Sequence, residues 1–462
     1  MSYIGNNPVT QSFISGTDYF NGTGSQTAFT LSRTVASIND IQVTVNNVVQ
    51  QPNDAYTISG TTLTMTSAPS AGTNNVYVRY LSTTTQAITP SQGTVSWNTL
   101  DSNVQGDLGI SFKNRIINSN MAIDQRNAGA ATANTINGYT LDRWVVAQST
   151  TGKLIVQQDA GAVTPPAGFN DYLGVTSQSA YSITSIDTYY IRQAIEGFNF
   201  ADCNWGTANA KTVTLSFWVR SSLTGTFGGS LNNAAYSRSY PFSYTINTAN
   251  TWEYKTITIA GDTTGTWIGA TNGVGLNVLI NLGAGSTFSG PANTWASAVY
   301  VAPTGATSVV GTNGATFYLT GVQLEVGTQA TTFTTAGGSY GAELALCQRY
   351  LPSLANNATG SGASAQFVGM ANAAVNGFFI VNFPVNARVA PTGATVINPT
   401  AFQGLNAAGN AWNSFTGIAF SSAGTNSANM YGTGISGLTI GQGLIVGTTS
   451  TTAQILFTGC EL

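Results

Sequence analysis

Apolar and polar residues alternate along most of the first 86 positions of the chain. This period of two is typical of β-strands that bury one face. Turn-forming residues interrupt the alternation, as at Pro52, Asn53 and Asp54 and again in residues 67–72. The pattern predicts a small antiparallel β-sandwich in residues 1–88. Its apolar positions include Ile41, Val43, Val45, Tyr56, Ile58, Leu63, Met65, Val76, Val78 and Tyr80.

The pattern changes in residues 89–117. Trp97, Leu100, Val104 and Leu108 are spaced by three, four and four positions, which places them on one face of a helix. We therefore expect a short helical linker, too short to be stable alone. Two roles stay open: a helix packed on a neighbouring domain, or a short coiled segment that joins three chains.

Residues 118–335 return to strand patterns. In residues 212–222, Leu215, Phe217 and Val219 alternate with Ser216, Trp218 and Arg220, so one face of this strand is predicted to lie in a core. Glycine-, Asn- and Thr-rich turns separate the segments, which favours a jelly-roll sandwich. The other strands expected here are 154–157, 254–259, 275–282 and 317–324.

Residues 336–462 are predicted to form a brief helix followed by a C-terminal β tip domain. The helix is expected at 341–351, and strands at 365–369, 377–383, 444–446 and 455–458. The chain as a whole is therefore predicted to be mostly β: serial antiparallel β-sandwich and jelly-roll domains with one or two short helices, in an elongated trimer.

Charge is scarce, with 14 Lys or Arg and 17 Asp or Glu among 462 residues, and there is no histidine. Charged residues make up 7% of the chain, against about 25% in ordinary proteins. The absence of histidine argues against histidine-based triads and zinc hydrolases. Between Tyr350 and Leu462 the only ionisable side chains are Arg388 and Glu461. The net charge of −3 gives no electrostatic footprint for nucleic acid.

No signal peptide and no apolar stretch of about 18 residues is present, so we expect no membrane insertion. Cys203, Cys347 and Cys460 form an odd set without a metal-binding or redox spacing. They are predicted to be buried free thiols.

Several stretches carry a resemblance to a known family. They are NRIINSNMAIDQRNAG (114–129), YTLDRW (139–144), FYLTGVQLEVGTQATTF (317–333), YGAELALCQRY (340–350), FPVNARVAPT (383–392) and ILFTGCEL (455–462), together with IQVTVNNVVQQPNDAYTISGTTLTMTSAP (41–69) near the N-terminus. With these stretches the chain resembles tail fibre or minor tail proteins of tailed bacteriophages.

This resemblance implies an architecture and a set of partners. Residues 118–335 would be a jelly roll similar to a carbohydrate-binding module, and residues 1–88 would attach to other phage tail or baseplate proteins. The chain would be a homotrimer that binds bacterial surface polysaccharide or lipopolysaccharide. It would be synthesised and assembled in the host cytoplasm and reside in the virion, with no nucleic acid bound.

Glycan binding requires aromatic faces for sugar rings and planar amides for hydroxyl groups. In residues 404–417, Trp412 and Phe415 lie among Asn410, Asn413 and Ser414, which makes this stretch the preferred receptor-contact loop. An aromatic residue that plugs the end of a trimer is an equal alternative. Tyr431 is the second choice.

Trp218 lies opposite the aliphatic face of its strand, where it could stack on a sugar, pack against another subunit or lie under a loop. Four other tryptophans have no face assigned by the sequence, and packing is the expected role for each. They are Trp205, Trp252, Trp267 and Trp295.

The carboxylates of the central region are scattered and match no catalytic motif, and no β-helix repeat is present. They are Asp142, Asp159, Asp171, Asp187, Glu196, Asp202, Glu253 and Asp262. Asp142 and Arg143 are predicted to form a structural ion pair. We expect no cofactor, although the turn at Asp262 could hold a structural calcium ion.

These observations predict a phage tail fibre, not an enzyme, that mediates attachment of the virion to the host cell surface by binding surface glycan. Two alternatives stay open. One is a structural virion connector, baseplate or head-decoration protein, and the other is a polysaccharide depolymerase.

Overall fold

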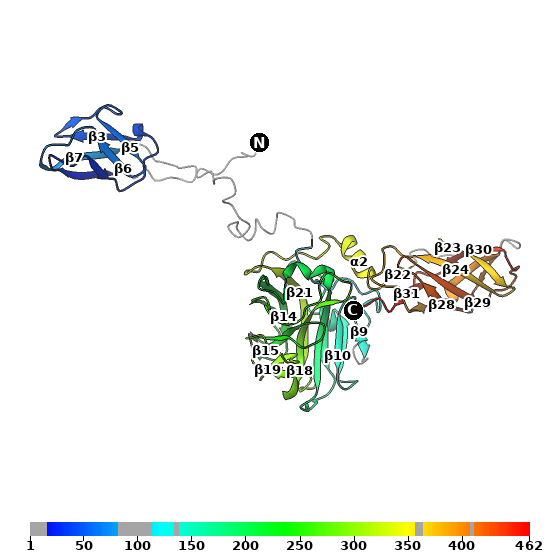
Figure 1. Ribbon diagram of the computed structural model, residues 1–462. Coiled ribbons are helices and arrows are strands. Elements are labelled where there is room, and N and C mark those ends of the chain that lie inside the picture. The colour runs from blue at the N-terminus through cyan, green and yellow to red at the C-terminus, as the bar shows by residue number, and fades with distance from the viewer. Residues whose placement is uncertain (1–15, 82–111, 134–137, 356–363, 407–410) are drawn as a thin grey trace. The chain divides into compact units, whose positions relative to one another are not determined.

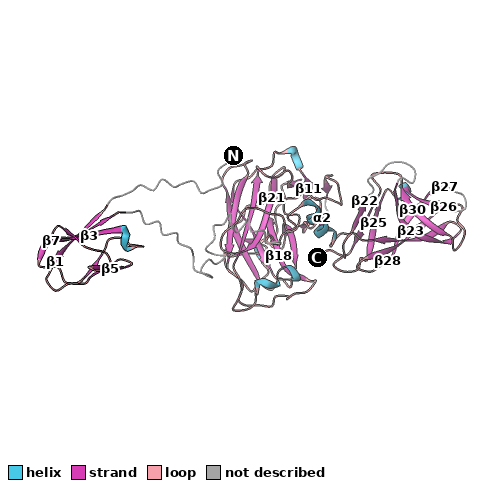
Figure 2. Cartoon of the chain, turned by 90° about the horizontal axis from the view of Figure 1, so that it is seen from above, coloured by secondary structure: helices cyan, strands magenta, loops and turns pink. Residues whose placement is uncertain are grey.

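The computed structural model describes residues 16–81, 112–133, 138–355, 364–406 and 411–462 (Figure 1). Strands dominate these ranges, and their only α-helix is α2 (Tyr340–Gln348) (Figure 2). The prediction of a mostly β chain with a brief helix near residues 341–351 is confirmed. The chain divides into two compact units, residues 1–99 and 100–462.

The described part of the first unit is a β-sandwich. Val43, Leu63 and Val78 are fully buried between its sheets, as the alternation predicted. Asn46 and Asn47, both at positive φ, form the tight turn from β3 to β4. The two sheets have the orders β1 (Thr17–Gly22), β7 (Gly72–Tyr80), β3 (Ile41–Val45), β4 (Val48–Val49), and β2 (Ala28–Thr30), β6 (Thr62–Met65), β5 (Tyr56–Ser59).

The second unit begins with a jelly-roll sandwich of two six-stranded antiparallel sheets. The β18 sheet has the order β16 (Ser239–Ile246), β15 (Gly225–Asn232), β18 (Val274–Ala284), β13 (Thr188–Glu196), β10 (Val145–Gln148), β9 (Gly138–Tyr139). The β14 sheet has the order β17 (Glu253–Ile259), β14 (Val213–Ser221), β21 (Thr316–Val326), β12 (Leu173–Ser177), β11 (Leu154–Gln158), β8 (Thr132–Ala133). Leu215, Phe217 and Val219 are fully buried between the sheets, as predicted.

Strand β15 could not be found from the pattern, because its glycines resemble a turn. A Cβ atom on Gly228 would lie 2.2 Å from the carbonyl oxygen of Phe242 and 2.4 Å from the ring of Pro303. A Cβ on Gly229 would lie 2.0 Å from the carbonyl oxygen of Leu279. These glycines allow close backbone approach inside a sheet, so they do not mark a chain reversal.

Most of the predicted linker helix of residues 89–117 lies outside the described residues, which resume at Phe112. The last residues of the range contact the jelly roll. Asn114 donates from its side chain to the carbonyl oxygens of Val322 and Thr334, at 3.0 Å each. Ile116 is fully buried in the jelly-roll core. Residues 114–116 therefore belong structurally to the jelly roll.

The C-terminal domain packs a three-stranded sheet and a seven-stranded sheet on a core that includes Phe379, Val446 and Ile455. The smaller sheet has the order β22 (Ser353–Ala355), β31 (Gln454–Thr458), β25 (Gly393–Ile397). The larger has the order β27 (Ala411–Ser414), β26 (Phe402–Asn406), β30 (Gly443–Thr448), β23 (Ser364–Ala373), β24 (Asn376–Asn382), β29 (Ser427–Thr433), β28 (Gly417–Ala423).

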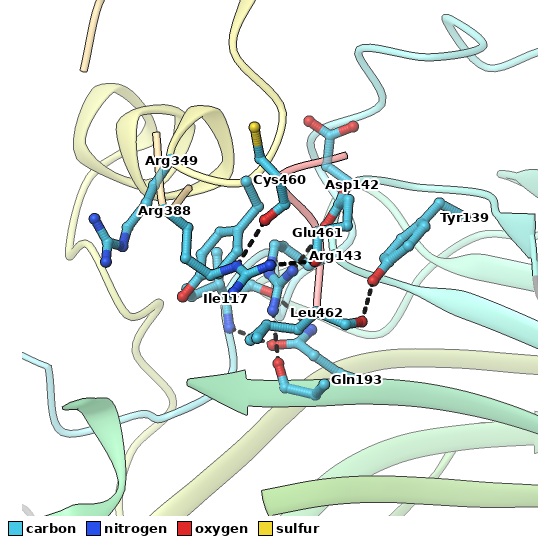
Figure 3. A network of polar contacts seen from close by, with 12 residues as sticks. Ile117, Tyr139, Asp142, Arg143, Gln193, Arg349, Arg388, Cys460, Glu461 and Leu462 are labelled. Carbon is cyan, nitrogen blue, oxygen red and sulfur yellow. Dashed lines mark hydrogen bonds and ion pairs between the residues drawn. The ribbon is translucent and has the colours of Figure 1, made fainter. Parts of the chain in front are cut away.

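A buried ion pair joins the end of the chain to the jelly roll (Figure 3). Arg143 is 2% exposed and pairs with Glu461 at 2.8 Å, and its guanidinium lies 3.6 Å from the centre of the Tyr350 ring. The predicted Asp142–Arg143 ion pair is therefore wrong. The Asp142 carboxylate instead accepts hydrogen bonds from Gln125, and burial raises the pKa of Asp142 to about 7.

Further contacts hold the last three residues in place (Figure 3). Arg388 donates to the carbonyl oxygens of Cys460 and Glu461 at 2.7 and 2.6 Å, and Tyr139 donates to that of Leu462 at 2.5 Å. We call these contacts, with the Arg143–Glu461 pair, the C-terminal clamp. Cys203, Cys347 and Cys460 are free and buried, as predicted.

Replacing Glu461 with alanine should strongly destabilise the second unit. The change leaves the Arg143 guanidinium buried without its carboxylate, which costs about 3 to 5 kcal/mol in comparable pairs. The measurement is urea unfolding of the full chain. Asp202→Ala is the control, because its pair with Arg115 leaves the Asp202 side chain 48% exposed and should cost about 1 kcal/mol or less. Equal losses from both variants would contradict the prediction.

Candidate functional site

Phe415 is not a receptor contact, which corrects the prediction for this residue. Its side chain is fully buried in the core of the C-terminal domain. Gly404 and Gly432 leave room for the ring: a Cβ on either would lie 3.3 or 2.5 Å from it. The predicted loop, residues 404–417, contains part of the hairpin formed by β26 and β27. Phe415 directly follows β27, and its ring points into the core of the C-terminal domain.

The other predicted residues of this domain do not form one site. Trp412 and Asn413 are partly exposed on edge strand β27, and Tyr431 is partly exposed on β29. Five strand spacings of about 4.8 Å separate β27 from β29. Asn410 lies outside the described residues. The proposed Trp412 and Tyr431 positions are therefore separate features of one sheet.

The outer face of the β18 sheet is covered by the chain itself. Leu279 lies on this face and is fully buried against Val301 and Ala302, which belong to the segment around β19 (Ser289–Gly290) and β20 (Ala302–Pro303). The region around Leu279 is therefore closed to a large ligand. The outer face of the β14 sheet is exposed at β17, where Tyr254, Thr256 and Thr258 are accessible, whereas its β14 and β21 residues such as Ser216 and Gln323 are buried.

Trp218 lies on this outer face of the β14 sheet. Its ring is 5.3 Å from that of Tyr254 on the paired strand β17, and the Tyr254 residue is 42% exposed. Burial raises the pKa of the Tyr254 hydroxyl group. The side-chain alternation thus places Trp218 as the sequence predicted, and pairing with β17 gives it an aromatic neighbour.

Two phenylalanines from loops extend this pair. Gly321 on β21 has a φ of +60°, and a Cβ there would lie 2.6 Å from the Phe169 ring and 3.2 Å from the Trp218 ring. Phe333 lies 4.9 Å from Phe169. We call Trp218, Tyr254, Phe169 and Phe333 the aromatic platform. All four residues are partly or well exposed.

Hydroxyl groups lie on the strands that carry the aromatic platform. Thr256 and Thr258 follow Tyr254 on the same face of β17 and are exposed. Thr214 and Ser216, which precede Trp218 on β14, are buried, as is Glu325 on the neighbouring strand β21. The sequence could have identified Tyr254 through its alternation with Ile257 and Ile259. Phe169 and Phe333 carried no such signal, because both lie in irregular segments more than 160 positions apart.

A second aromatic group lies on the same sheet. Tyr172 and Tyr318 make an edge contact at 5.4 Å, Trp252 lies 5.7 Å from Tyr172, and Arg220 stacks over Tyr318. Trp252 donates its indole hydrogen to a backbone carbonyl oxygen at 2.9 Å. Packing is therefore the role of Trp252. Trp205, Trp267 and Trp295 also pack together, against the jelly-roll core.

Asp159 and Asp171 form a carboxyl pair that the sequence did not predict. Burial, and then the neighbouring Asp159, raises the pKa of Asp171 to about 6. Asp159 also accepts a hydrogen bond from the Tyr172 backbone, at 3.0 Å.

Asp262 is not available for calcium, contrary to the prediction for this turn. Both carboxylate oxygens accept hydrogen bonds from Arg238, at 2.7 and 2.8 Å. Within the described residues no group of three or more His, Cys, Asp or Glu is placed to hold a metal ion. No helix in the described ranges is long and apolar enough to cross a membrane.

Comparisons with known proteins give only distant likenesses. No family model and no curated protein matches the chain. Among solved structures, the enzymatically active domain of tailspike protein 4 from bacteriophage CBA120 is 13% identical, with a TM-score of 0.26 over 46% of this chain and 21% of that one. A putative sugar binding protein from Bacteroides thetaiotaomicron is 12% identical, with a TM-score of 0.28 over 46% of this chain and all of that one.

A family 11 carbohydrate-binding module from Clostridium thermocellum, in complex with a mixed-linked tetrasaccharide, is 10% identical. Its TM-score is 0.23 over 43% of this chain and 98% of that chain. Likenesses this distant carry no argument about function. The proposal below therefore rests on the residues of this chain.

Asp171→Asn should raise the melting temperature by a few degrees at pH 8 and have little effect at pH 3. The pKa of Asp171 is raised to about 6 in the folded chain, while an unfolded aspartate has a pKa of about 3.9. Stability from this group is therefore fully present below about pH 4 and is lost as the pH rises from about 4 to about 6. Thermal unfolding at both pH values measures it. The same change at pH 3 and pH 8 would contradict the prediction.

Proposed function

We propose that this chain is a non-enzymatic tail fibre of a tailed bacteriophage, and that it attaches the virion to the host by binding a neutral glycan of the cell surface. The observation that carries the glycan proposal is the aromatic platform. Trp218 and Tyr254 lie side by side on the outer face of the β14 sheet, next to the exposed residues Thr256 and Thr258 of β17.

Sugar rings present apolar C–H faces and polar hydroxyl edges. The aromatic rings match the faces, and the exposed hydroxyl groups of Thr256 and Thr258 on β17 match the edges. A binding site of mostly apolar surface with a few polar groups is the usual design for small ligands. The low charge of the chain suits a neutral glycan better than an acidic one.

The proposed place in the virion rests on the sequence resemblance. In this proposal, residues 1–88 attach to other tail or baseplate proteins, and the chain acts as a homotrimer. Lipopolysaccharide and surface polysaccharide both fit as the glycan. The fibre would be synthesised and assembled in the host cytoplasm.

A structural virion protein is the second candidate. It would be a connector, a baseplate component or a head-decoration protein. The observation that favours it is an exposed aliphatic face on the C-terminal domain, where Val368 is 68% exposed and Ile380 is 52% exposed. A depolymerase has less support, because the carboxylates of the central region are scattered along the sequence and match no catalytic motif.

Trp218→Ala should weaken glycan binding by about tenfold, the equivalent of roughly 1.4 kcal/mol, because it removes the largest face of the aromatic platform. The full chain is used, since the C-terminal clamp makes truncation before residue 461 a test of folding as well. The measurement is binding to an array of neutral bacterial polysaccharides and lipopolysaccharide O-antigens.

Tyr254→Ala should have the same direction of effect. Phe198→Ala is the control, because Phe198 is a 58% exposed aromatic residue of the jelly roll outside the aromatic platform. If wild type binds and the two platform variants bind equally well, the site lies elsewhere. If wild type binds no polysaccharide on the array or on host cells, the structural candidate is favoured.

A further inference from the structure

The seven-stranded sheet of the C-terminal domain has apolar side chains on both faces. Its inner face supplies the core, for example Phe379 and Val446, both fully buried. Its outer face exposes Val368, Met370 and Ile380 by 68, 55 and 52%. An antiparallel sheet with one solvated face normally carries polar residues on that face, so a group of exposed aliphatic side chains there marks an interaction surface.

Strand register makes these exposed residues contiguous. Val368 pairs with Ile380 on β24 and with Ile445 on β30, and Ile445 is 40% exposed. Ile445 pairs in turn with Leu405 on β26, and Leu405 pairs with Trp412 on edge strand β27. The row therefore runs across five strands. We call it, with the parallel row below, the aliphatic face.

The parallel row consists of Met370, Phe378 and Tyr431, one residue on each of β23, β24 and β29. The Phe378 and Tyr431 rings are 4.9 Å apart. Met370, Phe378 and Ile380 also line a hollow of about 480 Å³, whose other lining residues are Gly369, Ser422, Ala423, Gly424, Ser427, Ala428 and Asn429. The aliphatic face therefore contains a depression that a side chain of another molecule can fill.

The outer face of the seven-stranded sheet, on which the aliphatic face lies, is large enough for a protein interface. Seven strands about 4.8 Å apart span roughly 29 Å, and strands of about six residues at roughly 3.3 Å each are about 20 Å long. The whole outer face is therefore on the order of 600 Å² per copy, and two such faces together reach about 1,200 Å². This value is the lower limit of the range for stable specific interfaces.

The scarcity of charge in the C-terminal domain indicates which partner fits the aliphatic face. Between Tyr350 and Leu462 the only ionisable residues are Arg388 and Glu461, and both are engaged in the C-terminal clamp. A charged partner would find no counter-charge on the aliphatic face. An identical copy would meet no like charge and would offer the same aliphatic side chains. Exposed Val, Ile and Met side chains also lack the hydrogen-bonding groups that sugar hydroxyls need.

We propose that the aliphatic face packs against the aliphatic faces of other copies of this chain. The inference deepens the proposed function, and rests on it only for the expected number of copies, three. It assigns a surface to self-association and leaves the aromatic platform of the jelly roll to the ligand. It also gives Trp412 and Tyr431 a role at the subunit interface.

The first test is the mass of the full chain in solution, measured by light scattering after gel filtration. Wild type should have a mass that is a multiple of 47.8 kDa. Val368→Glu and Ile380→Glu should each reduce it to that of one chain, because a carboxylate buried between aliphatic faces is costly. Ile186→Glu is the control: Ile186 is 68% exposed in the jelly roll, and this variant should keep the wild-type mass.

Cysteine crosslinking is the second test and does not depend on destabilising the interface. The three native cysteines are buried, so Val368→Cys adds the only exposed thiol of the described residues. Under mild oxidation it should give a covalent dimer on a non-reducing gel, whereas Ile186→Cys should stay a single chain. A wild type of one-chain mass, or Glu variants that stay associated, would overturn the proposal.

Polysaccharide binding by the same samples separates this inference from the proposed function. Dissociated Ile380→Glu chains that keep binding per site would support both. An associated wild type that binds no polysaccharide would support self-association and count against the glycan proposal. A single-chain wild type that binds polysaccharide would do the reverse.

Discussion

The second unit depends on one buried ion pair, between Arg143 and Glu461. A guanidinium that is 2% exposed must recover its lost hydration from the protein. Arg143 does so through the Glu461 carboxylate, the Ala194 carbonyl oxygen and the face of the Tyr350 ring. These partners come from the end of the chain, a jelly-roll strand and the residues after α2. Jelly roll and C-terminal domain are therefore coupled through this ion pair, the Arg349–Glu196 pair and the other contacts of the C-terminal clamp.

Several of the motifs that carry the family resemblance converge on this same region, whereas residues 41–69 belong to the first unit. Asn118 in residues 114–129 donates its backbone hydrogen to Glu343, which belongs to the 340–350 motif. Tyr139 and Arg143 of YTLDRW contact Leu462 and Glu461 of the last motif. The motif residues named here are engaged inside the protein. The resemblance therefore reports an architecture, which explains why it names no ligand.

Sequence patterns predicted elements better than contacts. Period-two alternation located the strands around Val43, Phe217 and Phe379, because burial of one sheet face is a local property of the chain. The wrong predictions concerned contacts that depend on the tertiary structure. Asp142 and Arg143 are adjacent in sequence, yet Arg143 forms its ion pair with Glu461, 318 positions away. Phe415 lies among polar loop-forming residues, and the space that its ring fills is left by Gly404 and Gly432, which lie on other strands. No local window contains that information.

The two outer sheet faces discussed above differ in a way that separates their roles. On the β14 sheet, aromatic rings lie among hydroxyl groups, so water and a glycan can both satisfy the surface. On the C-terminal sheet, Val368 and Ile380 expose branched aliphatic groups that neither water nor a sugar hydroxyl can satisfy. Only apolar surface removes that cost. In the proposed assembly, other copies of the chain cover the outer face of the C-terminal sheet, and the outer face of the β14 sheet stays free. Self-association at the C-terminal domain then multiplies the number of aromatic platforms available to a repetitive cell surface.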